Sequence, residues 1–181
     1  MVMKSYNFFP TNVWIGSLDI DNSKLLKKIY KFAEKTEPSI RSNEGGYQGH
    51  LFGDKQLYDK VVELIPRTKD LSSFNIYDWV NINKKGDKNS RHLHYTSDLY
   101  LSGVYYVKVP ENSGNIRFYD PRGPIVRDAQ DTVHFYGKYM YQYIIPQEGM
   151  LIFFPTWLEH DVEENESDED RVSIAFNIKV E

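Results

Sequence analysis

The stretch Arg171-Val-Ser-Ile-Ala-Phe-Asn-Ile-Lys-Val180 alternates apolar with polar or small residues along its whole length. Every even position is apolar, whereas Arg171, Ser173 and Asn177 are polar. Side chains of a β-strand point alternately to its two faces, so this segment is expected to be a strand with one face packed on a core. Its other face either contacts water or lines a site, and it places a guanidinium beside a hydroxyl.

Five further segments between residues 74 and 154 have the same strand-like composition, rich in aromatic and β-branched residues. They cover residues 74–83, 99–108, 115–120, 133–145 and 150–154. Turn residues separate them and no helical pattern lies between them. Short strands at this spacing predict a mainly β fold, an antiparallel sandwich or barrel rather than βαβ units.

The first 73 residues contain two segments with helical periodicity. Asp21, Asn22 and Ser23 are potential N-caps for a helix that ends before Pro38, and a second helix is expected from about Lys55 to Pro66. A glycine-rich loop is expected at residues 42–50. The 181 residues are therefore predicted to form a single domain, with a helical part over about 1–73 and a barrel over about 74–181.

Composition argues against several functional classes. The absence of cysteine excludes disulfides, thiolate-bound zinc, iron–sulfur clusters and cysteine nucleophiles. The net charge is -4 and basic residues form no long block, which disfavours an extended nucleic acid as a partner. Without a signal-peptide pattern or an apolar run long enough to cross a membrane, the expected location is the cytoplasm. The acidic run at residues 163–170 is expected to be a solvated loop.

Three of the five histidines occupy positions that suit a metal site. In an extended segment His92 and His94 point to the same side, about 7 Å apart. A barrel would bring His160, which follows a late strand, close to this pair. Imidazole suits iron, zinc, copper and nickel. The same spacing also fits ordinary surface histidines, and His50 and His134 have no comparable neighbours.

Arg171 and Ser173 could bind a carboxylate next to such a metal. A guanidinium can donate two parallel hydrogen bonds to a carboxylate, and the serine hydroxyl can add a third. A metal site with a carboxylate anchor beside it is what a keto-acid cosubstrate requires.

The order and spacing of short motifs along nearly the whole chain resemble the iron(II)/2-oxoglutarate-dependent oxygenase superfamily, and within it a family of short, mostly uncharacterised 2OG-Fe(II) oxygenases. The motifs are Phe9-Pro10, Gly45-Gly-Tyr47, Trp79-Val-Asn-Ile-Asn83, His92-Leu-His94, Leu101-Ser-Gly-Val-Tyr-Tyr106, Phe118-Tyr-Asp-Pro-Arg122, Leu151-Ile-Phe-Phe-Pro-Thr-Trp-Leu-Glu-His160 and Arg171-Val-Ser-Ile-Ala-Phe-Asn177. The resemblance implies a double-stranded β-helix, a jelly-roll similar to the cupin barrel, with the N-terminal helices packed outside.

The resemblance also implies the cofactors Fe(II) and 2-oxoglutarate. His92 and His160 match two metal ligands of the superfamily, and His94 stands where a carboxylate is usual. We expect His92, His94 and His160 to bind the metal, with Asp98 as an alternative ligand. The residues expected to bind 2-oxoglutarate are Arg171 and Ser173, together with Asn83, Tyr106 and, more weakly, Asn81.

The implied activity is hydroxylation of an unidentified substrate with release of succinate and carbon dioxide. Trp157, Arg122 and Tyr95 are the candidate substrate contacts, although each also fits an ordinary surface, core or turn role. Two alternatives remain: a cupin-like oxygenase that uses three histidines without 2-oxoglutarate, and a non-catalytic barrel that binds a metal or another ligand. The sequence indicates neither the primary substrate nor the oligomeric state.

Overall fold

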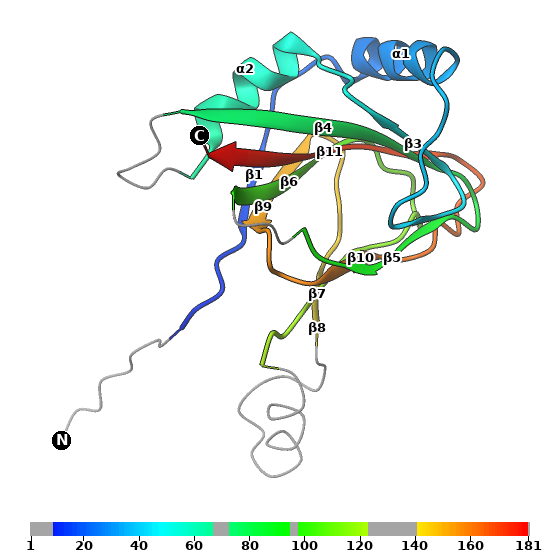
Figure 1. Ribbon diagram of the computed structural model, residues 1–181. Helices are drawn as coiled ribbons and strands as arrows, with labels where there is room; N and C mark the ends of the chain where they lie inside the picture. Colours follow the sequence, from blue (N-terminus) through cyan, green and yellow to red (C-terminus); the bar gives the residue numbers. More distant parts are fainter. Residues whose placement is uncertain (1–8, 67–72, 95–97, 123–140, 181) are drawn as a thin grey trace, which may run out of the picture.

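The computed structural model describes residues 9–66, 73–94, 98–122 and 141–180 (Figure 1). Two helices and eleven strands lie in these ranges. In chain order they are β1 (Trp14–Ser17), α1 (Asn22–Ala33), β2 (Asn43–Glu44), β3 (Tyr47–His50), α2 (Lys55–Leu64), β4 (Phe74–Asn83), β5 (Lys88–His92), β6 (Leu99–Lys108), β7 (Ile116–Tyr119), β8 (Tyr141–Ile144), β9 (Met150–Pro155), β10 (His160–Val162) and β11 (Arg171–Val180).

The strands form two antiparallel sheets. The larger sheet has the order β1-β9-β6-β11-β4-β3, and the smaller one has the order β2-β5-β10-β7-β8. In the larger sheet β11 pairs with β4 over its whole length and with β6 on its other side. Figure 1 shows α1 and α2 on the outer side of the larger sheet, with β5, β10 and β7 on the opposite side. This arrangement confirms the mainly β fold with helices packed outside.

Apolar and polar side chains alternate along β11 and point to opposite faces of the larger sheet. Four of the five large apolar side chains of β11 are fully buried in the core between the larger sheet and the helices, and Val180 at its end is partly buried. That core includes Val172, Ile174, Phe176 and Ile178 from β11, and Leu25, Ile29, Leu57 and Val61 from α1 and α2. The odd residues Arg171 and Ser173 are also buried, at 1% and 6% exposure, because they face the space between the two sheets rather than water.

A second core fills part of the space between the sheets. It consists of Val104, Tyr106, Ile116, Phe118, Ile152, Phe154 and Leu158, from β6, β7, β9 and the turn after β9. The inner space therefore has an apolar part built by this cluster and a polar part beside Arg171 and Ser173.

Some sequence expectations differ from the structure. The expected loop at residues 42–50 is wrong, because β2 and β3 lie there, joined by Gly45 and Gly46 at φ values of +75° and +67°. The short strands β1, β5 and β10 carry little alternation and were not predicted. Of the expected strand at 133–145, β8 covers the end, and residues 133–140 lie outside the described residues.

The acidic run at 163–170 does connect β10 to β11 without regular structure, but it is only partly solvated. Asn165 is completely buried and donates hydrogen bonds from Nδ2 to the carbonyl oxygens of Asn83 (2.9 Å) and Glu169 (2.8 Å). This side chain ties the loop to the end of β4.

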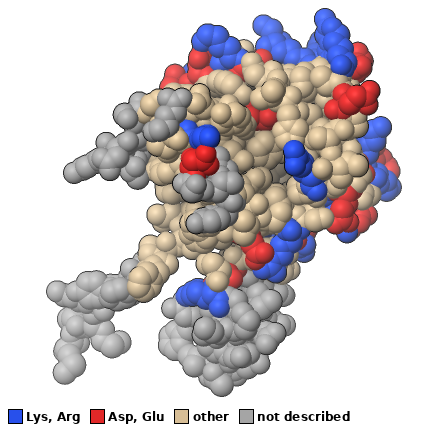
Figure 2. Space-filling model, in the orientation of Figure 1, with Lys and Arg blue, Asp and Glu red and all other residues tan. Residues whose placement is uncertain are grey.

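Both helices begin at an aspartate that caps them. Asp21 accepts a hydrogen bond from the backbone N of Lys24, and Asp54 accepts one from the backbone N of Leu57, each at 3.0 Å. Neither described helix combines the length and apolar character that a membrane span requires. On the face shown in Figure 2, described acidic and basic side chains are mixed around the rim, and the middle is largely uncharged.

Asp54 provides a pH-dependent test of how α2 is attached. Its carboxylate also lies 2.5 Å from Lys28 Nζ on α1. Burial raises the pKa of Asp54, but the hydrogen bonds from Lys28 and Leu57 outweigh it and hold the pKa below its usual 3.8. We expect Asp54→Ala to lower the free energy of unfolding at pH 7 by about 2 kcal/mol, and Asp54→Asn, which retains a cap, by about 1 kcal/mol.

Because the folded-state pKa is depressed, the charge contributes its stability above pH 4 and loses it as the pH falls through the folded pKa. Urea unfolding at pH 7 and pH 3 should therefore show the wild type and Asp54→Asn converging at the lower pH. An equal difference at both pH values would contradict the ion pair between α1 and α2.

Gly114 and Gly86 provide a matched pair for backbone packing. Both have positive φ, +88° and +89°, so alanine is strained at either position. A Cβ at Gly114 would lie 2.5 Å from the carbonyl oxygen of Glu163, whereas one at Gly86 would meet no atom of the described ranges within 4 Å. We expect Gly86→Ala to cost about 1 kcal/mol and Gly114→Ala about 2 kcal/mol more, measured by denaturant unfolding. Equal losses would show that Glu163 and its neighbours move aside freely.

Candidate metal and cosubstrate site

The smaller sheet brings three histidines together. His92 is the last residue of β5 and His160 the first residue of β10, and the two strands pair with these residues opposite each other. His94 follows two residues after β5, where its backbone N donates a hydrogen bond of 2.9 Å to the carbonyl oxygen of Thr156. This bond holds the segment after β5 against the turn that precedes His160.

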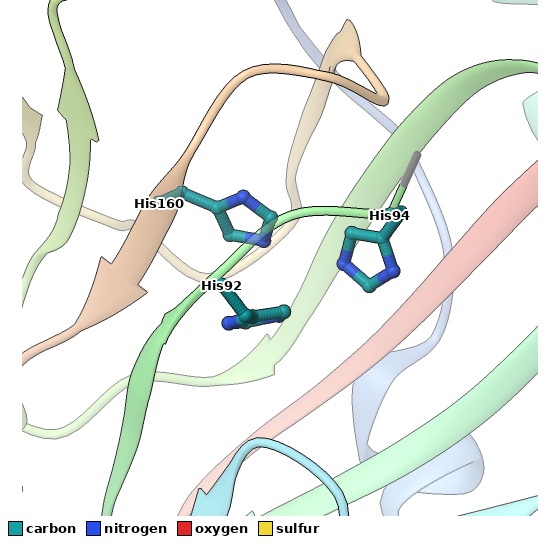
Figure 3. Close-up of side chains that lie close together, drawn as sticks. All are labelled: His92, His94 and His160. Carbon is teal, nitrogen blue, oxygen red and sulfur yellow. The ribbon is translucent and has the colours of Figure 1, made fainter. Parts of the chain in front are cut away.

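The three rings face one another (Figure 3). One ring nitrogen from each of His92, His94 and His160 lies within 4.8 Å of those of the other two. The ring centroids are 4.3 Å apart for His92 and His160, 4.9 Å for His92 and His94, and 5.2 Å for His94 and His160. Three imidazoles on one ion, with bonds of about 2.1 Å, have neighbouring nitrogens about 3 to 3.6 Å apart. The cluster is therefore compatible with a metal site in which the three rings lie closer together than they do here.

Burial keeps the three imidazoles neutral at pH 7. Burial, with a smaller contribution from His92, lowers the pKa of His94 to about 4. Burial also lowers the pKa of His160 well below its usual 6.5, and that of His92 to a smaller extent. Neutral imidazole is the form that binds metals.

Backbone carbonyls fix the proton of two of these rings. Nδ1 of His92 donates to the carbonyl oxygen of Ser90 at 2.7 Å, and Nδ1 of His160 donates to that of Leu158 at 2.9 Å. Because a carbonyl oxygen only accepts, both protons must be on Nδ1. Nε2 of each ring then carries a free lone pair, as a metal ligand requires.

Aromatic rings surround the cluster and account for its low polarity. Phe154 and Phe118 pack against His160, with centroids 4.7 and 6.1 Å away. Trp79 packs on His94 at 5.5 Å, and His50 lies beyond Trp79 at 6.0 Å. His50 is therefore separated from the cluster by an indole ring.

The histidine cluster lines a cavity between the two sheets. The cavity has a volume of about 50 Å³, several times the roughly 10–15 Å³ that one water occupies on this scale. Most of its other polar lining comes from the inner faces of three neighbouring strands: Asn81 and Asn83 on β4, Ser102 and Tyr106 on β6, and Arg171 and Ser173 on β11. The strand register explains this grouping, since Arg171 lies opposite Asn83, and Ser173 lies opposite both Asn81 and Tyr106.

Arg171 is a buried cation with an unused donor. Its Nη1 donates to the carbonyl oxygens of Ser113 and Glu163, the latter at 3.2 Å. Its Nη2 has no hydrogen-bond partner among the residues that the structure describes, although Arg171 is only 1% exposed. A buried N–H of a charged group is costly to leave unpaired, so this atom fits an anionic ligand in the cavity. Burial also raises the pKa of Tyr106, whose phenol therefore remains a donor beside Arg171.

The remaining candidates lie in different surroundings. The Asp98 carboxylate is 2.6 Å from Lys179 Nζ and exposed to solvent. Arg122 pairs with Asp120 at 2.6 Å on the surface. Trp157, in the turn between β9 and β10, is 42% exposed. Tyr95 and His134 lie outside the described residues.

The structure adds three residues to which the sequence assigned no role here. Trp79 packs on His94, Asn177 lies next to it, and Ser102 donates a hydrogen bond to Asn177. For Asn177 a signal did exist, because it shares the polar face of its strand with Arg171 and Ser173. The contacts of Trp79 and Ser102 depend on the register between neighbouring strands, which the sequence of a single strand does not reveal.

Two facing antiparallel sheets with a ligand cavity between them define a double-stranded β-helix, the jelly-roll class. Residues 78–177 match a protein-family model described as "Putative 2OG-Fe(II) oxygenase". This match covers more than half of the chain, which therefore belongs to the 2OG-Fe(II) oxygenase family, a family of oxidoreductases that use Fe(II) and 2-oxoglutarate. The family resemblance of the sequence motifs is thereby confirmed.

Solved structures share the fold. A prolyl-4-hydroxylase from Pseudomonas putida superposes with a TM-score of 0.67 at 15% identity, covering 94% of each chain. HygX from Streptomyces hygroscopicus, with nickel and 2-oxoglutarate bound, gives 0.63 at 11% identity and covers 94% of this chain and 83% of its own. A prolyl hydroxylase from Trichoplax adhaerens gives 0.66 at 16% identity, covering 93% and 83%. These structural matches confirm the double-stranded β-helix. A comparison with curated protein sequences finds no match.

Proposed function

We propose that the chain is an Fe(II)- and 2-oxoglutarate-dependent dioxygenase that hydroxylates an unidentified substrate and releases succinate and carbon dioxide. His92, His94 and His160 bind the metal in this proposal, and Arg171 and Ser173 bind the far carboxylate of 2-oxoglutarate. The observation that carries it is the unpaired Nη2 of Arg171, which lies in the same cavity as the three histidines.

The donor set fits a ferrous ion. Three neutral imidazole nitrogens are typical donors for iron among the first-row metals. They leave the full double positive charge of the ion in place. A ferrous ion held by these three residues would favour a negatively charged chelating ligand, because such a ligand would compensate the charge of the ion.

The far wall of the cavity fits a carboxylate. Nη2 of Arg171, the hydroxyl of Ser173 and the phenol of Tyr106 are the donors available to it, and Asn83 and Asn81 lie alongside. A dicarboxylate with a keto group could therefore contact the metal with one end and the guanidinium with the other. A cupin-like oxygenase that uses no 2-oxoglutarate leaves the spare donor of Arg171 unexplained.

The bound metal and cosubstrate would supply the oxidation itself, in which dioxygen is reduced, 2-oxoglutarate becomes succinate and carbon dioxide, and one oxygen atom goes to the substrate. The protein orients both groups through the residues named above. Phe118, Phe154 and Trp79 exclude water from the metal side of the cavity. Trp157, exposed in the turn just before His160, is our candidate for contacting the primary substrate, with Arg122 as a weaker one.

Metal binding can be tested with a matched pair of histidine variants. We expect anaerobic addition of Fe(II) or Co(II) to raise the melting temperature of the wild type, because an ion that binds only the folded state stabilises it. His160→Ala should abolish the rise, whereas His50→Ala should retain it, since His50 lies beyond Trp79. If neither ion raises the melting temperature of the wild type, the result would favour a barrel that binds no metal.

Cosubstrate binding can be tested at Arg171 and Ser173. Anaerobic titration of the Fe(II)-loaded protein with 2-oxoglutarate should produce a weak visible charge-transfer band. We expect Ser173→Ala to weaken binding about 10-fold and Arg171→Met about 100-fold, the loss typical of hydrogen bonds to a charged group. Ser167→Ala, the same substitution in the loop before β11, should bind as the wild type does.

Because Arg171→Met could impair folding, its circular dichroism and melting temperature should be recorded alongside, and Ser173→Ala serves as the milder variant. Metal binding without any band in the wild type would favour the cupin-like alternative. Full affinity in both variants would place the cosubstrate elsewhere.

A further inference from the structure

The hydrogen-bond partner of His94 differs in kind from those of His92 and His160. Its Nδ1 lies 3.5 Å from Nδ2 of Asn177 rather than next to a carbonyl oxygen. Oδ1 of Asn177 in turn accepts a hydrogen bond of 2.8 Å from the hydroxyl of Ser102, which is 1% exposed. An amide therefore contacts the third ring of the cluster where carbonyl groups contact the other two.

An amide has two different ends, and each selects a different proton position on His94. With Nδ2 of Asn177 facing the ring, Nδ1 accepts and the imidazole proton sits on Nε2. This nitrogen points toward the other two rings, where its proton would block a metal (Figure 3). With Oδ1 facing the ring, Nδ1–H donates and Nε2 has a free lone pair.

Ser102 makes both orientations possible. A hydroxyl can donate to Oδ1 of Asn177 in the first orientation and accept from its Nδ2 in the second. Asn177 on β11 and Ser102 on β6 lie opposite each other in the sheet, so strand pairing holds them in contact. The Trp79 ring packs on His94 with an interplanar angle of 34° and restricts its movement. The amide can thus turn while the ring remains in place.

We propose that Ser102 and Asn177 form a hydrogen-bond switch that sets the tautomer of His94 and thereby how tightly the metal is held. This inference rests on the proposed metal site. Asn177 is a positioning residue that acts through His94. Metal binding requires the amide to turn its oxygen toward the ring, so the balance between the two amide orientations sets the affinity of the site for a divalent ion.

Substitutions at Asn177 test the switch with Co(II) alone as the probe. Asn177→Asp offers only acceptors, fixes the proton of His94 on Nδ1 and should tighten Co(II) binding about 10-fold. Asn177→Leu removes the partner and should weaken Co(II) binding about 10-fold. Gln56→Glu, which adds the same charge on the exposed side of α2, should leave the affinity unchanged.

Long-range ¹H–¹⁵N NMR of the histidine rings separates the switch from a general structural effect. In the metal-free wild type at neutral pH we expect the proton on Nδ1 in His92 and His160 and on Nε2 in His94. In Asn177→Asp, and in the wild type with Zn(II), all three rings should carry it on Nδ1. Finding the proton of His94 already on Nδ1 in the metal-free wild type would overturn the proposal.

The two proposals fail in different ways. If the wild type binds Co(II) and the Asn177 variants bind it with the same affinity, the switch is wrong and the metal site stands. If the wild type neither binds Co(II) nor shows changes in the histidine signals, the metal site fails and the switch fails with it.

Discussion

The pairing of β11 with β4 on one side and β6 on the other determines both the core and the site. Its apolar residues pack under the helices, and its polar residues face the cavity between the sheets. The same register places Ser173 against Asn81 and Tyr106, and Asn177 against Ser102. A slip of one residue would exchange the two faces, burying Arg171 under the helices and exposing the cavity to Ile174. Stability and chemistry thus depend on one register.

Arg171 shows how the structure accommodates a cation without a buried carboxylate beside it. Moving a charge out of water costs several kcal/mol unless other groups compensate. Here the carbonyl oxygens of Ser113 and Glu163 accept hydrogen bonds from Nη1 of Arg171. The compact turn at Gly114 brings these two carbonyls together. Burial lowers the pKa of Arg171, but a guanidinium still remains protonated at pH 7. The remaining N–H donor of Arg171, at Nη2, therefore favours binding of an anion in the cavity.

The sequence predicts the long strands and the helices well because their patterns extend over many residues. β4, β6 and β11 have ten residues each, and alternation along β11 is complete. β10 has only three residues, and its pairing with β5 and β7 defines it rather than its own composition. The sequence places His92 and His94 on one face of a strand, whereas His94 lies beyond β5 and is held by Thr156. Their role in metal binding stays a prediction.

The replacement of a carboxylate by His94 changes the charge of the proposed centre. If the ligands were two histidines and a carboxylate, the ferrous ion, the ligand carboxylate and 2-oxoglutarate would together carry one negative charge. Arg171 would neutralise this charge. With three histidines the ion and the cosubstrate are neutral, and Arg171 leaves a net positive charge in a cavity of low polarity. A positively charged centre is stabilised by ligands that donate more electron density to the metal. The hydrogen-bond partner of His94 controls how strongly this imidazole donates. An amide at Asn177 supplies only a dipole there, so the orientation of that dipole matters more than it would beside a ligand that is itself charged.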